Sequence, residues 1–343
     1  SITVTSSPSI ALSYTGTTSP VTVSGTFASN TSYTFTIAAT NANGTGSTSS
    51  ASTSVIPSPA YTLSQTFNAS GTYTVPAGAS KMAVYTYGTA GNGYPGQAGI
   101  PYAGGFGGAG GAGGSLAFFE EYTVTPGTNY TVTIGANANQ PVGGDSTVNV
   151  AGTTSFGNIV SVLGSSSASW FGGQPSPAPA GNYTSNLNNI KFAAGSGGGD
   201  GGYRSSATNL TNGAGNNSAV DGSVGVAGTN VVPTDANLPT KQSGGGGGGG
   251  GGGAYSYANN NGVSGAGGGN GGALDGGAGG AGGNAKGTVT RYANTGSVGS
   301  PGTQPAGGGG GGGGDGCQYY AGNNTYNAFG GLGGKGQVIV YVK

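Results

Sequence analysis

The chain has 343 residues, of which only 5% are charged, and its 8 basic and 8 acidic side chains give a formal net charge of zero. This balance argues against a basic nucleic-acid surface and against a polybasic membrane patch. Because the sequence has no histidine and a single cysteine, Cys317, it predicts no imidazole catalysis, no zinc site and no intrachain disulfide.

Residues 1–57 carry the alternation that is typical of β-strands in a sandwich. The stretches 2–5, 21–24 and 33–38 each alternate apolar side chains with small polar ones. A segment rich in Ser and Thr then leads to Pro57, and we expect it to form one more strand. The length of the whole chain leaves room for one or two further domains.

Residues 33–46 carry a resemblance to a known family. The phrase Tyr-Thr-Phe-Thr-Ile-Ala-Ala-Thr-Asn-Ala-Asn-Gly-Thr-Gly, residues 33–46, resembles the penultimate strand and last hairpin of a fibronectin type III domain. Tyr33 matches the tyrosine corner of such sandwiches. The resemblance covers only the back half of that domain, so it implies a partial fibronectin type III or immunoglobulin-like sandwich. We expect its first strands to lie upstream of Ser1, and an abbreviated module is the alternative.

Residues 58–61 are expected to be a linker, and residues 62–343 to be a second, glycine-rich domain. Short strand-like segments recur along this domain before and after its glycine runs. They are residues 66–78, 81–88, 115–119, 122–135, 154–157, 159–163 and 336–342. Strands separated by so much sequence predict one sandwich, opened near residue 62 and closed by the last strand.

Two phrases of this domain carry a second resemblance. One is Gly-Thr-Tyr-Thr-Val-Pro-Ala-Gly at residues 71–78, and the other is Thr-Pro-Gly-Thr-Asn-Tyr-Thr-Val-Thr-Ile-Gly at residues 125–135. Together with the closing apolar strand, they resemble the glycine-rich domain of phage tail-fibre and minor tail proteins. The resemblance spans roughly residues 62–343 and implies an all-β protein of the virion.

The 82 glycines are concentrated in runs that interrupt the strands. We expect these runs to order as polyglycine-II rods, left-handed helices of the polyproline-II type that hydrogen-bond to one another; floppy loops are the alternative. At about 3.1 Å per residue, ten glycines would span about 31 Å. The arrangement resembles the polyglycine sandwich at the receptor-binding tip of some T-even-type phage fibres. The segments are residues 104–114, 195–202, 244–253, 265–283, 307–316 and 330–336.

Aromatic side chains in the polar segments are the candidate receptor-binding residues. Tyr and Trp offer large, rigid contact areas with a polar group, and loops rich in Tyr, Ser, Gly and Asn are typical of recognition surfaces. The alternative is that these rings cap the glycine rods or cover the sandwich. The candidates are Tyr94, Tyr102, Trp170, Phe171, Tyr183, Tyr203, Tyr255, Tyr257, Tyr319 and Tyr320, with Trp170 and Phe171 expected in a loop.

Catalytic chemistry is not indicated by the acidic residues. Glu120 and Glu121 are adjacent on an expected strand, where successive side chains point to opposite faces. We expect them to form a solvated strand end, and a cation site is the alternative. Nothing in the spacing of the acids predicts a glycosidase pair. No catalytic residue, metal ligand or cofactor is therefore predicted, and no segment has the length of a transmembrane helix.

The predicted function is that of a non-enzymatic virion surface protein of a tailed phage, a tail-fibre or adhesin module. Its expected partners are a host surface polysaccharide or outer-membrane protein and other virion proteins, with a homotrimer left open. No nucleic-acid partner and no membrane insertion are expected, and the location is the tail fibre or the capsid exterior. The alternative is a purely architectural protein, such as a capsid decoration, spike or fibre shaft, without receptor binding.

Overall fold

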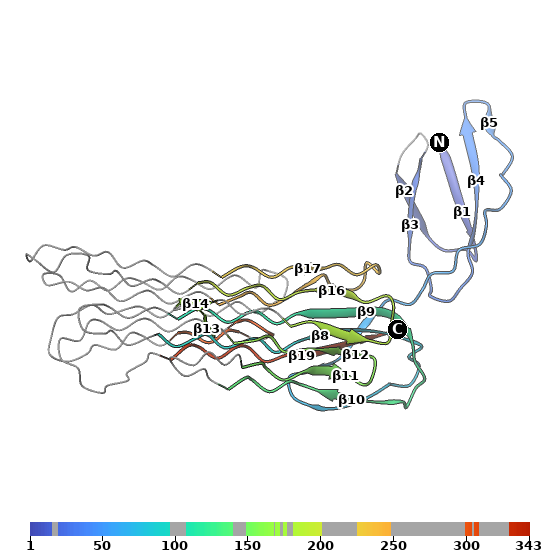
Figure 1. Cartoon of the computed structure of the whole chain (residues 1–343). Coiled ribbons are helices and arrows are strands. Elements are labelled where there is room, and N and C mark those ends of the chain that lie inside the picture. Colours follow the sequence, from blue (N-terminus) through green and yellow to red (C-terminus); the bar gives the residue numbers. More distant parts are fainter. Residues whose placement is uncertain are drawn as a thin grey trace, which may run out of the picture. The chain divides into compact units, whose positions relative to one another are not determined.

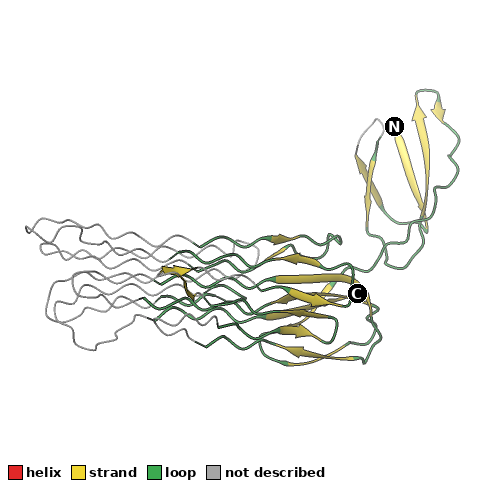
Figure 2. Cartoon of the chain, in the orientation of Figure 1, coloured by secondary structure: helices red, strands yellow, loops and turns green. Residues whose placement is uncertain are grey.

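The computed structural model consists of β-strands and loops, with no helix in the described part of the chain (Figures 1 and 2). It divides into two compact units, Ser1–Ala60 and Tyr61–Lys343. The division falls inside the expected linker, but Tyr61 is buried in the second unit. The described residues are 1–15, 20–96, 108–139, 149–167, 169–171, 174–176, 181–200, 225–247, 299–303, 305–308 and 329–343.

The first unit contains two small antiparallel sheets, in the strand orders β1-β4-β5 and β2-β3. The β1–β4 register places Val4 opposite Ile37, so the apolar residues of both strands share one face, as the alternation predicts. The strands are β1 (Ile2–Ser7), β2 (Leu12–Thr15), β3 (Thr22–Gly25), β4 (Thr34–Asn41) and β5 (Gly44–Thr45).

Tyr33 is the best-packed side chain of the first unit, with only 3% of its surface exposed. Its hydroxyl accepts a hydrogen bond of 3.0 Å from the backbone N–H of Ala28. The ring meets Phe27 edge to face, with the centroids 5.2 Å apart. A buried hydroxyl without such a partner would cost free energy, so this bond helps to fix the turn before β4.

The expected strand before Pro57 is not formed as predicted. Residues 46–54 carry no strand, and Val55 makes only an isolated bridge to Tyr33. The segment nevertheless runs alongside Tyr33 and β4 and is hydrogen-bonded to them. Its N–H groups at every third residue donate to carbonyls at every second residue of the partner: 46 to 39, 49 to 37, 52 to 35 and 55 to 33. One bond every third residue is the period of an extended threefold helix rather than that of a twofold strand.

The second unit is built on two five-stranded antiparallel sheets. The first has the strand order β15-β12-β11-β10-β7, and the second has the order β16-β9-β8-β19-β6. The first sheet comprises β7 (Gly71–Thr74), β10 (Asn129–Thr133), β11 (Thr154–Phe156), β12 (Val160–Val162) and β15 (Tyr183–Ser185). The second comprises β6 (Thr62–Phe67), β8 (Lys81–Tyr87), β9 (Leu116–Thr123), β16 (Lys191–Ala193) and β19 (Gln337–Val342).

The closing strand is placed as the sequence predicts. β19 lies between β6 and β8 and pairs antiparallel with both, so that Ile339 is opposite Thr66 on one side and Tyr85 on the other. The strands thus join residues 62–67 to the last residues of the unit across more than 270 positions. The glycine-rich sequence between them has to leave the sheets and return to them.

The main apolar core fills the space between the two sheets. Its largest fully buried members are Phe119, Phe156, Met82 and Tyr73, each with at most 1% of its surface exposed. The aromatic rings are in direct contact, for example Phe156 and Tyr130, which stack at 5.1 Å. This interdigitation of two inner faces is the usual way in which a β-sandwich is stabilised.

A second apolar cluster covers the other face of the second sheet. Tyr85 stacks on Phe118 with the ring centroids 4.3 Å apart, and both are fully buried. The cover comes from residues 225–243, which include the short strands β17 (Asn230–Val231) and β18 (Lys241–Gln242). The second sheet is therefore buried on both faces, which explains why β8 reads as a nearly continuous apolar run.

Candidate functional site

The described glycine segments run side by side from the ends of the strands of the second unit (Figure 2). Three of them, residues 108–114, 195–199 and 244–247, are joined to one another by backbone hydrogen bonds. We call these three segments the glycine triad. They come from parts of the sequence far apart, so their contacts are tertiary rather than local.

The first layer of the triad is a closed circuit of three hydrogen bonds. Gly113 N–H donates to the carbonyl of Ser196 at 2.9 Å, and Ser196 N–H donates to Gly244 at 3.1 Å. Gly244 N–H completes the circuit by donating to the carbonyl of Gly114 at 2.9 Å. Each segment is thus both donor and acceptor, which satisfies the backbone groups without a sheet.

The second layer repeats the circuit three residues further along each segment. Gly110 donates to Gly199 at 2.9 Å, Gly199 donates to Gly247 at 2.7 Å, and Gly247 donates to Gly111 at 2.9 Å. The step of three in every segment is the repeat of a helix with three residues per turn. A β-ladder would give a step of two.

Neighbouring segments follow the same rule. Gly91 and Tyr94, three residues apart, donate to Ala112 and Ala109, again three residues apart. Residues 299 and 302 likewise donate to residues 329 and 332. The pattern therefore extends beyond the triad into segments on its flanks.

Glycine is required sterically at most of the glycine positions of the triad, which also contains Ala109, Ala112 and Ser196. A Cβ built on Gly198 would lie well inside 3.0 Å of the carbonyl of Gly110, a separation that real Cβ atoms essentially never show. Gly113, Gly195 and Gly246 meet neighbouring carbonyls in the same way. Gly197 is the exception, because a Cβ there would meet nothing within 4 Å. The close approach of the segments, and not flexibility, explains this use of glycine.

Small polar side chains tie the glycine segments to the sandwich. Asn92 is fully buried; its amide donates to the carbonyl of Ala138 at 2.9 Å and its side-chain oxygen accepts from Gly333 N–H at 2.9 Å. The hydroxyl of Ser165 donates to Gly113 at 2.8 Å and accepts from Gly181 N–H at 3.0 Å. These side chains thus satisfy backbone groups of the glycine segments in the buried part of the unit.

A cluster of charged residues lies where β9 and β19 of the second sheet end. It corrects the expectation of a solvated strand end for Glu120, whereas the Glu121 side chain is 50% exposed. The Glu120 side chain is only 10% exposed and accepts a hydrogen bond from Lys191 Nζ at 2.8 Å. It also accepts from the backbone N–H groups of Thr234 and Asp235. Burial raises the pKa of the Glu120 carboxyl, but these hydrogen bonds together outweigh it and hold the pKa below its usual range.

The same cluster places Lys343 between two carboxylates. Its side chain is 5% exposed, and Nζ lies 2.5 Å from Glu121 and 3.2 Å from Asp235. Nζ also lies 4.4 Å from the centroid of the Tyr61 ring. Burial lowers the pKa of Lys343, yet the two carboxylates outweigh this and raise it. Each of the three carboxylates of this cluster is thus paired with a lysine, and Lys343 is shared by two of them.

Sequence reasoning did not find this cluster. Glu120 and Glu121 lie together in a bulge of β9, where Glu121 has a φ of 60°. Both side chains therefore reach the cluster from one strand. Five of the 16 charged residues of the chain meet here: Glu120, Glu121, Lys191, Asp235 and Lys343. The scarcity of charged residues could have indicated such a cluster, because a charged side chain that is buried needs a partner of opposite charge. The pairing itself depends on tertiary contacts.

The predicted receptor-binding residues are not gathered at one described site. Tyr94 is fully buried, so its ring is not exposed to a receptor as we expected. Tyr183 is partly buried and packs on Phe192 at 4.6 Å. Trp170 and Phe171 lie in a short strand, β13 (Ser169–Phe171), that pairs with β14 (Gln174–Ser176), instead of in a loop. The others lie outside the described residues: Tyr102, Tyr203, Tyr255, Tyr257, Tyr319 and Tyr320.

The described residues contain neither a candidate metal site nor a candidate membrane-spanning helix. No group of three or more His, Cys, Asp or Glu side chains in them could hold a metal ion. No helix among them is long and apolar enough to cross a membrane. Comparison with known proteins adds no assignment, because no protein-family model matches the sequence and no curated protein matches it.

Proposed function

We propose that the chain is a non-enzymatic surface protein of a tailed-phage virion, in which a rigid glycine scaffold presents polar, aromatic segments to a host receptor. The observation that carries this proposal is the repeated three-bond circuit of the glycine triad. A repeat of three residues, with each segment bonded to several others, is what a bundle of polyglycine-II rods requires. We propose that architecture for the glycine segments.

A contact in the first unit, made by Tyr33, also supports this proposal. The Tyr33 hydroxyl reaches back five residues to the backbone of Ala28, which is the contact that defines a tyrosine corner. We propose that this unit is the back half of a fibronectin type III-like sandwich. Such a module would serve to connect the glycine-rich unit to other proteins of the particle.

A purely architectural role is the second candidate, and one observation favours it. Of the two predicted receptor-binding tyrosines whose side chains are described, Tyr94 is fully buried and Tyr183 is partly buried against the core. Tyrosines that cap and cover the scaffold would need no receptor. If the chain does bind a receptor, we propose that it does so through candidates outside the described residues, such as Tyr255 and Tyr257.

Adsorption competition separates the two roles. Purified chain would be added to susceptible bacterial cells before the virus, and free virus would be counted over time. We expect a dose-dependent loss of adsorption that is weakened when Tyr255 and Tyr257 are replaced by Ser. A folded chain that never blocks adsorption would favour the architectural role.

A further inference from the structure

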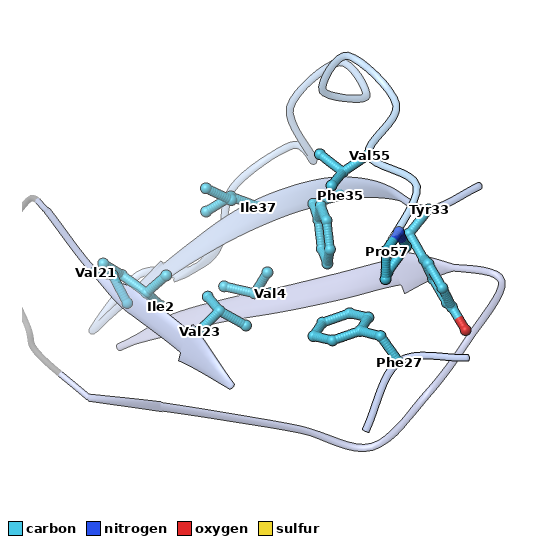
Figure 3. A pocket seen from close by; sticks show the side chains of 10 residues that line it. All are labelled: Ile2, Val4, Val21, Val23, Phe27, Tyr33, Phe35, Ile37, Val55 and Pro57. Atoms are coloured by element: carbon cyan, nitrogen blue, oxygen red, sulfur yellow. The ribbon is translucent and has the colours of Figure 1, made fainter. Parts of the chain in front are cut away.

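The first unit has an apolar groove between its two sheets, with a volume of about 520 Å³ (Figure 3). Its ten lining residues are all apolar or aromatic. Val21 and Val23 lie along one wall, and Val4, Phe35 and Ile37 lie along the other. The side chains point into the space between them, as they would in the core of a sandwich.

This core is only partly covered. Val4 is 7% exposed, but Ile37 and Val55, which line the same groove, are 49% and 55% exposed. Exposed apolar surface that is gathered in one groove marks an interaction site more strongly than scattered apolar residues do. The groove therefore lacks part of the material that would complete it.

The wall formed by β3 indicates the form of the missing material. β3 pairs with β2 along one edge, and no strand of the described residues pairs with its other edge. An open strand edge beside an apolar groove is a template for an added strand, which supplies backbone hydrogen bonds and alternate apolar side chains. A compact apolar ligand would leave this edge unsatisfied.

The charge of the unit restricts the occupant further. Residues 1–60 contain no Asp, Glu, Lys, Arg or His. A charged side chain placed in the groove would lose its hydration and find no partner, at a large cost in free energy. The complementary strand is therefore uncharged on the side that enters the groove.

We propose that the groove binds one β-strand of a partner polypeptide, added to the free edge of β3. The strand carries apolar side chains at alternate positions and no charge among them. Its apolar residues fill the space between Val23 and Ile37, while its backbone pairs with β3. The proposal does not depend on receptor binding by the second unit.

A labelled peptide tests the proposal on the full chain. The probe is a blocked, fluorescent eight-residue peptide of alternating Thr and Val. Its control has the same composition but places all the Val residues together. We expect saturable binding of the alternating peptide by fluorescence anisotropy, at least tenfold tighter than that of the control. N-methylation of alternate residues on one edge of the peptide should abolish binding, because it removes the backbone donors.

Two protein variants locate the binding site. Ile37→Lys places a charge in the groove at a position that is already half exposed, and we expect at least a tenfold loss of affinity. Thr3→Lys adds the same charge to the opposite face of the β1–β4 sheet, because Thr3 alternates with Val4, and it should leave binding unchanged. Equal affinity for both peptides, no binding of either, or a concentration-dependent dimer that buries the groove in a second copy would overturn the proposal.

Discussion

The two halves of the second unit are held together by different interactions. In the sandwich, side chains such as Phe156 and Phe119 fill the space between two sheets and are fully buried. In the glycine triad, the backbones approach too closely for side chains, and hydrogen bonds link segments from residues 108–114, 195–199 and 244–247. The comparison teaches that one chain can bury its backbone either behind side chains or against other backbone.

The cost of the second solution is entropic. Ordering glycine costs about 0.5 to 1 kcal/mol more per residue than ordering alanine. A typical hydrogen bond returns only about 0.5 to 1.5 kcal/mol net. The triad therefore needs nearly every backbone group to be paired, whereas the sandwich tolerates irregular edges such as the bulge at Glu121.

The largest effect should come from the side-chain core. Phe156→Ala empties a site that is fully buried beneath the rings of Tyr73, Phe119 and Tyr130. We expect a loss of about 3 to 5 kcal/mol in the free energy of unfolding, measured by chemical denaturation. Leu63→Ala, at a site 58% exposed, is the control and should change the stability by less than about 0.5 kcal/mol. A similar loss in both variants would show that the sandwich core does not govern unfolding.

Adding a single methyl group by a Gly→Ala substitution tests whether the segments of the glycine triad are closely packed or form an open loop. Gly198→Ala should lower the free energy of unfolding by about 2 to 3 kcal/mol, because the Cβ would overlap the carbonyl of Gly110. Gly197→Ala, one residue away, should be neutral or slightly stabilising, since its Cβ enters open space. Thermal unfolding of the two variants checks this difference, and equal melting temperatures would contradict the close packing.

The charged cluster around Glu120 should make the stability of the sandwich depend on pH. The pKa of Glu120 is lowered in the folded chain, so its contribution is present above the unfolded pKa of about 4.3 and is lost as pH falls further. Asp235 behaves in the same way, because its pKa is also lowered. We expect the melting temperature to be level from about pH 6 to 8 and to fall below about pH 4.

The variant Glu120→Gln provides the control for that titration. It keeps the shape of the side chain but removes the charge that faces Lys191. At neutral pH we expect it to be about 1 to 2 kcal/mol less stable, with a weaker dependence on acid. An unchanged acid dependence would assign the transition to other carboxylates.

Much of the sandwich could be predicted because its strands obey local rules. The segments 81–88 and 122–135 have the apolar content and turn residues of strands. The structure places β8 in the first, and the end of β9 and all of β10 in the second. β16 could not be predicted, because it has only three residues, follows two asparagines closely, and is defined by its tertiary pairing with β9. The segment 46–54 was wrongly predicted as a strand, because composition does not show that its hydrogen bonds to β4 recur at every third residue.

The candidate sites were harder to predict from composition. Aromatic residues in a polar context suggested a binding surface, but Tyr94 is fully buried and packs with Ala109. The groove beside Ile37 carried no local signal. It depends on how the strands of the first unit pair, and alternation alone does not indicate the pairing.

Hydrogen exchange at the glycine amides is the most direct test of the central claim, that backbone hydrogen bonds order the glycine segments. NMR with ¹⁵N-glycine would report the exchange rates of Gly110, Gly113, Gly199, Gly244 and Gly247, whose N–H groups donate within the triad. The account predicts protection comparable to that of core strand amides such as Val84, lost only on global unfolding. Exchange at the rate of an unfolded chain, with Val84 still protected, would contradict it.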